Sequence, residues 1–251
     1  MPGLDQTISG AWPLLPGAAP AAVRLVYDED DASLRQVEPL DAKNRCAGEA
    51  GLDGLLPCVP CFTPGALIVT GRGECPVEEL RPGDRVVTRD SGVQTVLWTG
   101  ACTYGWRDLG LLPVLRPVLI RAGALGRGLP ARDLLLSPNH RLLVQSRGEG
   151  GTVAEEGLVA AADLVGRPGI DTVAPVSVSY LQVLFSRHEA ILADGVWTES
   201  FRPGAASLAA MSDVARAEVL AILPDAGDAG WSGPAPVRPE VSGRDVLAFS
   251  A

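Results

Sequence analysis

Five cysteines, two histidines and one Ser-x-x-His segment are the residues of this chain that could form and break bonds. The cysteines are Cys46, Cys58, Cys61, Cys75 and Cys102, and the histidines are His140 and His188. A cysteine thiolate is a nucleophile, and an imidazole with a pKa of about 6.5 can move a proton at neutral pH. An odd number of cysteines in a chain this long does not indicate a disulfide framework. At least one thiol is therefore left for nucleophilic catalysis, with two imidazoles to assist it.

Cys61 stands out among the cysteines by its position. It lies in the segment Pro60–Gly65 (PCFTPG), directly before the β-branched run Ala66–Thr70. A cysteine at the edge of a domain is by itself usually a small buried hydrophobe. The chemical interpretation of Cys61 therefore depends on which groups the fold brings to it.

Both histidines occupy comparable places in the sequence. Ser137-Pro138-Asn139-His140 joins two apolar runs, 134–136 and 142–144, and should hold His140 at the start of a strand. His188 precedes the apolar run 190–193. A lone histidine more often has a structural role, but two at strand edges of one domain favour a common site.

The elements that must position these side chains are short strands. From residue 61 to about 203, apolar and β-branched runs alternate with turn residues, and Asp194-Gly195 is one such turn. This spacing predicts an all-β domain, in which only Leu158–Val165 fits a short helix. The predicted strands are Ala66–Thr70, Pro76–Leu80, Arg85–Thr88, Gln94–Thr99, Val118–Arg121, Leu134–Leu136, Arg141–Gln145, Val176–Phe185 and Ala190–Ala193.

The flanking regions differ in composition. Residues 1–60 are rich in Gly, Ala and Pro, with one predicted strand at Ala22–Tyr27. Residues 204–251 contain a helical pattern over Ala206–Leu223, followed by a Gly/Pro-rich tail. We therefore expect an N-terminal segment (1–60), a β-rich domain (61–203) and a C-terminal helix with its tail (204–251).

Composition and charge exclude several classes of protein. No apolar run approaches the ~18–20 residues that span a bilayer. The net charge is −9 and the basic residues are scattered, so nucleic acid is not an expected partner. The N-terminal residues lack the basic start and apolar stretch of a secretory signal. We expect a cytoplasmic protein, or one exported without an N-terminal signal.

Four blocks of this sequence, in order, resemble those of a Hint domain, the self-processing module shared by inteins and Hedgehog proteins. The match is closest to the compact bacterial form. The blocks are Cys61–Thr70, Val77–Val86, Ser137–His140, which resembles a Thr-x-x-His block, and His188–Val196. The resemblance implies a compact horseshoe of short strands, with a short helical appendage beyond it. It implies no metal and no organic cofactor.

The resemblance also implies a reaction and its residues. Cys61 would attack the carbonyl carbon of Pro60 in an N–S acyl shift, and His140 would donate a hydrogen bond and then a proton to the amide nitrogen. Ser137 would hold the scissile backbone or orient His140. His188 is a candidate for activating the thiol or aiding attack on the thioester, and Asp194 and Asp84 are further candidates. The partners would be the chain's own N-terminal segment as substrate and water or another small nucleophile as acceptor.

One departure from the family pattern limits the reaction. A splicing intein ends its late hairpin with His-Asn, whereas this chain has Glu199-Ser200 and no asparagine after Asn139. Asparagine cyclisation therefore has no nucleophile, and complete splicing is not expected. The alternative interpretation is a Hint-fold scaffold or interaction module that does not cleave.

Cys58 and Cys61 form a Cys-x-x-Cys pair. No β-α-β unit surrounds the pair, as thioredoxin-like chemistry expects, and Cys75 and Cys102 are poorly spaced to complete a zinc site. Accidental spacing is the first interpretation. Redox control of Cys61 by Cys58 is the second.

Overall fold

The computed structural model describes residues 60–147, 154–204, 207–208, 211–227 and 233–249, and the backbone of four strands before residue 60. The chain divides into two compact units. Unit 1 comprises residues 1–57 and 203–232, and unit 2 comprises residues 58–202 and 233–251. Cys61 and both histidines belong to unit 2.

Unit 1 contains an antiparallel sheet in the order β1 (Gln6–Ser9), β2 (Ala22–Tyr27), β3 (Leu34–Leu40) and β4 (Ala50–Gly51). The strand predicted at Ala22–Tyr27 is confirmed. The helix predicted within 206–223 is α4 (Asp213–Ile222). It begins after Ser212, whose hydroxyl accepts a hydrogen bond from the Ala215 N–H, and it ends just before Pro224.

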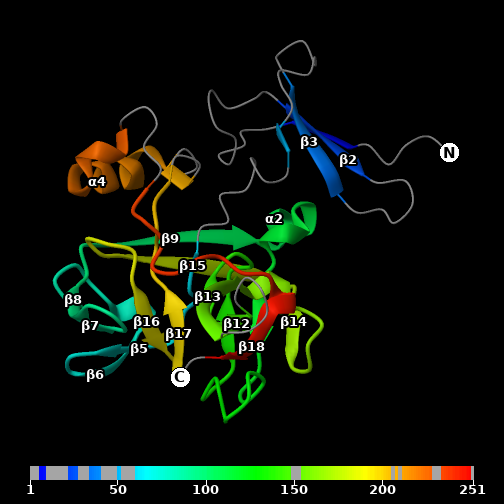
Figure 1. Ribbon diagram of the computed structural model, residues 1–251. Coiled ribbons are helices and arrows are strands. Elements are labelled where there is room, and N and C mark those ends of the chain that lie inside the picture. The colour runs from blue at the N-terminus through cyan, green and yellow to red at the C-terminus, as the bar shows by residue number, and fades with distance from the viewer. Residues whose placement is uncertain are drawn as a thin grey trace. The chain divides into compact units, whose positions relative to one another are not determined.

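Unit 2 is built of antiparallel strands (Figure 1). Its largest sheet follows the order β13-β12-β17-β16-β5-β7-β8, with β6 paired to β5 and β18 to β12. The bounds are β5 Leu67–Thr70, β6 Gly73–Pro76, β7 Arg85–Thr88, β8 Gly92–Thr95, β12 Arg141–Arg147, β13 Ala154–Ala160, β16 Ala190–Ala193, β17 Val196–Glu199 and β18 Val246–Phe249.

Two further groups of strands complete the unit. The long strands β9 (Trp98–Gly105) and β15 (Ser177–Leu184) run side by side through their whole length (Figure 1). Strand β10 (Val118–Ile120) lies between β11 (Leu134–Leu136) and β14 (Ile170–Thr172). The all-β class with short helices is confirmed.

The strands form where apolar residues recur at alternate positions. In β15, Val178 and Tyr180 are buried, while Ser179 between them is half-buried. Buried side chains from most strands pack into a single core, which includes Phe62, Ile68, Leu136 and Leu142. The hairpin between β16 and β17 turns at Asp194 and Gly195, both at positive φ (47° and 82°), as the predicted Asp-Gly turn requires.

Several elements of unit 2 differ from the sequence prediction. The predicted strand Gln94–Thr99 is divided between β8 and β9, and strands β6, β14, β17 and β18 were not predicted. Residues predicted as a helix over Leu158–Val165 finish strand β13 and then form the 3₁₀ helix η3 (Ala161–Leu164). Here pairing of Leu158 with Leu143 on β12 overrides local helix propensity. The predicted strand Pro76–Leu80 is mostly the 3₁₀ helix η1 (Val77–Glu79). A short helix, α2 (Trp106–Leu111), follows β9 and was not predicted.

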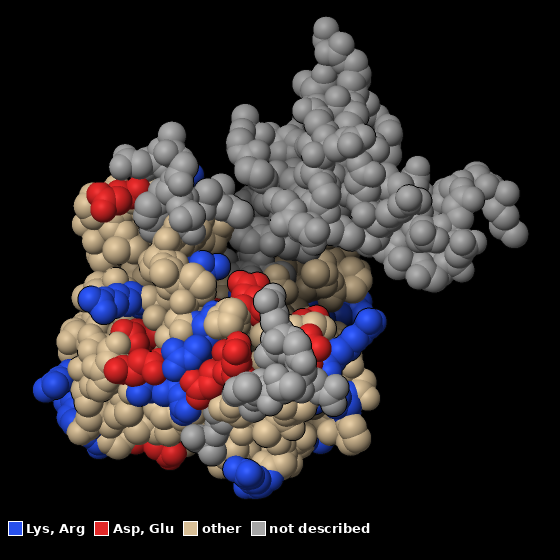
Figure 2. Space-filling view, viewed as in Figure 1, with Lys and Arg blue, Asp and Glu red and all other residues tan. Residues whose placement is uncertain are grey.

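The last residues of the chain fold back onto unit 2. Val241 N–H donates to the Leu158 carbonyl (2.9 Å), and β18 pairs with β12. Arg238 forms ion pairs of 2.8 Å with both Asp90 and Glu156. Figure 2 shows acidic and basic side chains intermixed on this face rather than gathered by sign. We call residues 233–249 the returning tail.

Among the described residues, no helix is both long and apolar enough to cross a membrane.

Candidate active site

Phe62 fixes the position of Cys61 in the fold. Its N–H and carbonyl exchange hydrogen bonds with Leu181 of β15 (2.9 and 2.8 Å), and it also bridges Leu136 at the end of β11. The Phe62 side chain is fully buried in the core. Cys61 is thereby placed where β11 ends and beside β15, with only 3% of its surface exposed.

Ser137, the first residue after β11, contacts Cys61 at two points. The backbone N–H of Cys61 donates to Ser137 Oγ (2.9 Å). The Ser137 N–H donates to the Cys61 carbonyl (3.0 Å). The N–H of the Pro60–Cys61 peptide bond is thus held by a buried hydroxyl, which restricts how that bond can rotate and move.

A tight turn carries Ser137 and His140 together. The His140 N–H donates to the Ser137 carbonyl (3.0 Å), which closes the turn around Pro138 and Asn139. Helix η3 supports the turn from behind, because Ala161 and Ala162 donate to the carbonyls of His140 and Pro138 (both 2.9 Å). The predicted Ser-x-x-His connection is therefore a rigid turn directed at Cys61.

His140 is fully buried, and its ring lies 4.4 Å from the Phe62 ring, centroid to centroid. Neither ring nitrogen has a well-aligned hydrogen-bond partner among the described residues. Burial lowers the pKa of His140 from 6.5 to about 4, against the raising effect of Glu199 and the Cys61 backbone. The expectation of an unperturbed imidazole is wrong, and His140 is neutral at pH 7.

His188 is held by two groups. Its Nδ1 accepts a hydrogen bond from the Val237 N–H of the returning tail (3.0 Å). An accepting Nδ1 carries no proton, so the ring proton is on Nε2, which lies 3.2 Å from Glu199 Oε2. The Nε2–H therefore lies against the carboxylate as a polar contact of an uncharged ring, although it is not well aligned for a hydrogen bond. Both nitrogens of His188 are therefore engaged away from the Cys61 thiol.

Glu199 and Gln182 are residues of this site that the sequence did not reveal as functional. Gln182 Nε2 donates to Cys61 Sγ (3.6 Å), so an amide, not a histidine, provides this contact with the thiol. A polar side chain in phase with buried Val178 and Tyr180 on β15 was the available signal. Glu199 is 1% exposed and is noticeable in the sequence only as a departure from the family pattern.

The two aspartates considered as candidates have structural roles. Asp194 accepts from the Leu67 N–H (3.1 Å) and pairs with Arg132 (2.9 Å), which fastens the β16–β17 hairpin to β5. Asp84 accepts from the Arg81 N–H (2.8 Å) in a surface turn. Neither contact involves Cys61, Ser137 or His140.

The other cysteines lie apart in the fold. Cys75 is half-buried on β6, Cys102 is exposed on β9, and no disulfide joins any of the three described cysteines. Cys58 and Cys46 lie outside the described residues. Within the described part of the chain, no three His, Cys, Asp or Glu side chains gather as metal ligands.

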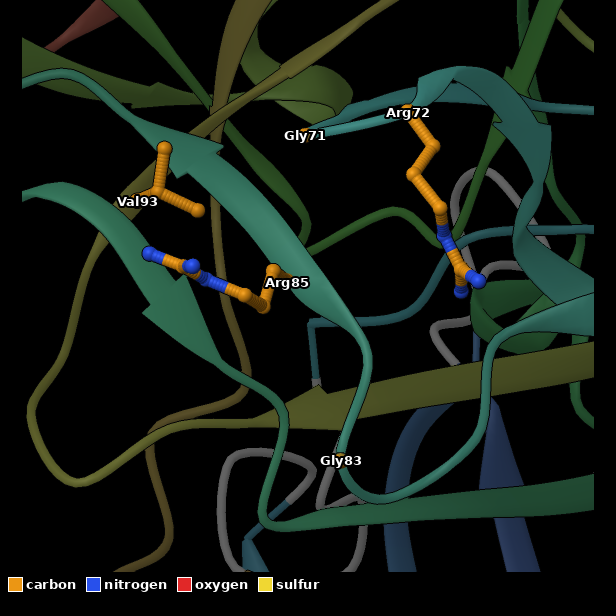
Figure 3. A pocket seen from close by; sticks show the side chains of 5 residues that line it. All are labelled: Gly71, Arg72, Gly83, Arg85 and Val93. Carbon is orange, nitrogen blue, oxygen red and sulfur yellow. The ribbon is translucent and has the colours of Figure 1, made fainter.

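A surface groove of about 530 Å³ lies elsewhere on unit 2. It is lined by Gly71, Arg72, Gly83, Arg85 and Val93, and Figure 3 shows Arg72 and Arg85 projecting from separate segments around it. Arg72 is already paired with Asp84 (2.9 Å). The groove contains none of the residues around Cys61.

Comparison with protein families gives one match, to the Hint domain, over residues 60–205. The matched range begins at the residue before Cys61 and extends past Glu199. A comparison with curated proteins finds no match.

Solved structures of similar proteins include two inteins and an intein-like domain. The gp41-1 intein is 11% identical, covering 55% of this chain and 97% of its own, with a TM-score of 0.34. A bacterial intein-like domain from Clostridium thermocellum is 15% identical, covering 56% and 97%, with a TM-score of 0.31. A DnaB intein from Synechocystis sp. PCC 6803 is 8% identical, covering 56% and 98%, with a TM-score of 0.35.

Proposed function

The chain belongs to the Hint domain family, and from this membership we propose that it is a self-processing protein that cleaves the Pro60–Cys61 bond without complete splicing. Cys61 is the nucleophile of an N–S acyl shift onto the carbonyl carbon of Pro60. The single observation that carries the proposal is the pair of hydrogen bonds by which Ser137 holds Cys61, with His140 on the same turn.

The first step moves one proton and exchanges one bond. Neutral His140 accepts the thiol proton of Cys61, and Sγ attacks the Pro60 carbonyl carbon. The bond from that carbon to the Cys61 nitrogen breaks, and the nitrogen takes the proton from the His140 imidazolium. The products are a thioester on Sγ and a free amine on Cys61. This order differs from the sequence expectation, because a histidine with a pKa of about 4 begins as a base.

Proximity and hydrogen bonds lower the barrier of this step. The thiol and the carbonyl carbon belong to adjacent residues, so no binding step is needed to bring them together. The hydrogen bond from Gln182 favours the thiolate over the thiol. Ser137 Oγ fixes the amide N–H, so its nitrogen reaches the proton donor in one orientation.

The second step releases the N-terminal segment. Water or an added thiol attacks the thioester carbonyl, the carbon–sulfur bond breaks, and the thiolate of Cys61 takes up a proton. No later step is available, because Glu199-Ser200 stands where a splicing intein has its asparagine. His188 is assigned neither to activation of the thiol nor to attack on the thioester, because its two ring nitrogens face Val237 and Glu199.

Intact mass of the purified chain tests this proposal. Excess dithiothreitol should divide the folded protein between Pro60 and Cys61 over hours and leave a fragment that begins with Cys61. An unchanged full-length mass in folded protein after long incubation would instead support the second candidate, a Hint-fold scaffold that does not cleave. That candidate is favoured by one observation, the 3% exposure of Cys61, which limits access of an outside nucleophile to the thioester.

A further inference from the structure

Four polar side chains meet in the interior beside Cys61, and the sequence pattern gave Glu199 no part among them. Glu199 comes from the end of β17, Arg141 from the start of β12, and the two histidines from the turns before β12 and β16. Glu199, His140 and His188 are each at most 4% exposed. A carboxyl buried this deeply requires partners, because desolvation of a charge is costly.

The partners of Glu199 hold it in the ionised form. Oε1 accepts hydrogen bonds from the Arg141 N–H (3.0 Å) and the Arg141 guanidinium (3.2 Å), and Oε2 lies 3.2 Å from His188 Nε2. Burial acts to raise the pKa of Glu199, but His188, Arg141 and His140 outweigh it and lower the pKa from 4.5. A negative charge is thus fixed in the interior at neutral pH.

His188 does not neutralise that charge. Its Nδ1 accepts from the Val237 N–H, which is the arrangement of an uncharged ring. Arg141 shares its own charge with Glu240 of the returning tail (2.9 Å). The Arg141 N–H that donates to Glu199 Oε1 belongs to the residue next to His140, so the Glu199 carboxylate lies beside the His140 backbone. Part of its field therefore acts on His140, the one imidazole of the cluster without a well-aligned partner among the described residues.

We propose that Glu199 is a positioning residue of the acyl shift, which stabilises the His140 imidazolium while the proton passes from Cys61 Sγ to the Cys61 nitrogen. Glu199 neither gains nor loses a proton in this step. The inference rests on the proposed function of Cys61 and His140. It assigns a role to the position at which the chain departs from the splicing inteins.

The charged groups around His140 support this direction of effect. The charge of Arg141 disfavours the imidazolium, and among the charged side chains Glu199 is the one that favours it. An opposite charge nearby typically raises such a pKa by about 1–3 units, and each unit is a factor of ten in the imidazolium population. Loss of the Glu199 charge should therefore slow the shift by about tenfold or more.

The experiment compares three substitutions in the full-length chain by the rate of cleavage in dithiothreitol. Glu199→Gln keeps the size of the side chain and an oxygen for Arg141 but removes the charge, and should slow cleavage by about tenfold or more. Glu199→Asp keeps the charge in a shorter side chain and should be faster than Glu199→Gln. Glu155→Gln removes an exposed carboxylate on β13, outside this cluster, and should stay within about twofold of the unmodified chain.

A purely structural role gives a different order of rates. The shorter aspartate leaves the larger defect in packing, so Glu199→Asp would then be as slow as Glu199→Gln or slower, and this order overturns the inference. Circular dichroism in the aromatic region checks that each variant is folded. Equal rates for Glu199→Gln and the unmodified chain overturn it as well.

A second measurement does not depend on cleavage. In the Cys61→Ala background the chain stays intact, and its two histidines give two imidazole signals in NMR, assigned with a His188→Gln variant. Adding Glu199→Gln should move the titration midpoint of His140 to lower pH, and an unchanged midpoint contradicts the inference. If the unmodified chain does not cleave at all, the proposed function fails, whereas this comparison still decides whether Glu199 acts on His140.

Discussion

Cys61 differs from the other described cysteines in its surroundings rather than in its own properties. Gln182 contacts its sulfur and Ser137 holds its backbone, whereas Cys75 and Cys102 lie on strands β6 and β9. Burial, together with the nearby carboxylates of Glu79 and Asp84, raises the pKa of the Cys75 thiol and makes it a poor nucleophile. The proposed nucleophile is therefore distinguished from the other described cysteines by its contacts, which the spacing of cysteines in the sequence does not show.

Substitution of single cysteines should follow this distinction. Cys61→Ala removes the attacking atom and should abolish cleavage in dithiothreitol while the domain stays folded, because one small buried side chain replaces another. Cys75→Ala and Cys102→Ala should cleave at nearly the unmodified rate. Intact mass and thermal unfolding check both statements, and cleavage of Cys61→Ala at the same bond would refute the assigned nucleophile.

The buried histidine makes a prediction about stability in acid. Unfolded chain binds a proton on His140 below pH ~6.5, whereas folded chain keeps this ring neutral down to about pH 4. The contribution of His140 to the free energy of unfolding is thus fully present above pH ~6.5. As the pH falls toward 4, the free energy of unfolding decreases by up to about 3 kcal/mol because of this group.

Denaturant unfolding in the Cys61→Ala background measures this effect. Between pH 6.5 and 5 the free energy of unfolding should fall more steeply for Cys61→Ala than for Cys61→Ala with His140→Gln. This window lies above the usual pKa of 4.5 for Glu199, whose own contribution is lost only at lower pH. Parallel curves for the two proteins would contradict a lowered pKa of His140.

At the scale of elements, the sequence predicted where most strands lie. Strands β7, β11 and β16 match the predicted bounds. A short β-branched or apolar run between turn residues seldom forms any other secondary structure. Residues 158–160 were assigned to a helix because their local pattern is ambiguous, and only their pairing with β12, distant in sequence, decides in favour of a strand.

The site residues that were predicted from the sequence are those whose placement depends on neighbouring residues, and the ones that were missed depend on contacts between distant strands. Ser137 and His140 were predicted because they share one turn, whose geometry is local. Gln182 lies on β15 and Glu199 on β17. No short-range sequence pattern predicts which face of either strand is directed toward Cys61 or His140. Contacts between distant elements are the information that a single sequence did not supply.

The attachment of the returning tail depends on a glycine. Gly243 lies against helix η3 so closely that a Cβ atom would overlap the Asp163 carbonyl oxygen. Gly243→Ala should therefore displace the tail from η3 and lower the free energy of unfolding by about 1–3 kcal/mol. Gly110→Ala on α2 is the matched control, since no atom lies within 4 Å of its added Cβ. Equal stability of the two variants would show that the tail is not packed as described.

At the scale of the whole molecule, the division into units does not follow the order of the chain. Unit 2 is interrupted by residues 203–232 and resumes at Gly233. The sequence predicted one C-terminal appendage over 204–251, whereas the residues from 233 onward supply β18 and the Val237 N–H on His188. The late part of the chain thus contributes a strand to the largest sheet of unit 2 as well as the appended helix.

The interruption has a consequence for what the chain can carry. Residues 203–232, which contain α4 and are counted with unit 1, leave unit 2 and return to it at Gly233. They close a loop in the chain of unit 2, and the entropy of closing such a loop grows only with the logarithm of its length. Doubling the loop costs about 0.6 kcal/mol, so a folded reporter inserted between Gly227 and Gly233 should leave the melting temperature of unit 2 nearly unchanged. Scanning calorimetry would test this, and loss of the unit 2 transition would contradict it. A guest domain inserted there would be joined to unit 2 at both of its ends. The proposed cleavage at Pro60–Cys61 would therefore leave it attached while the upstream segment is released.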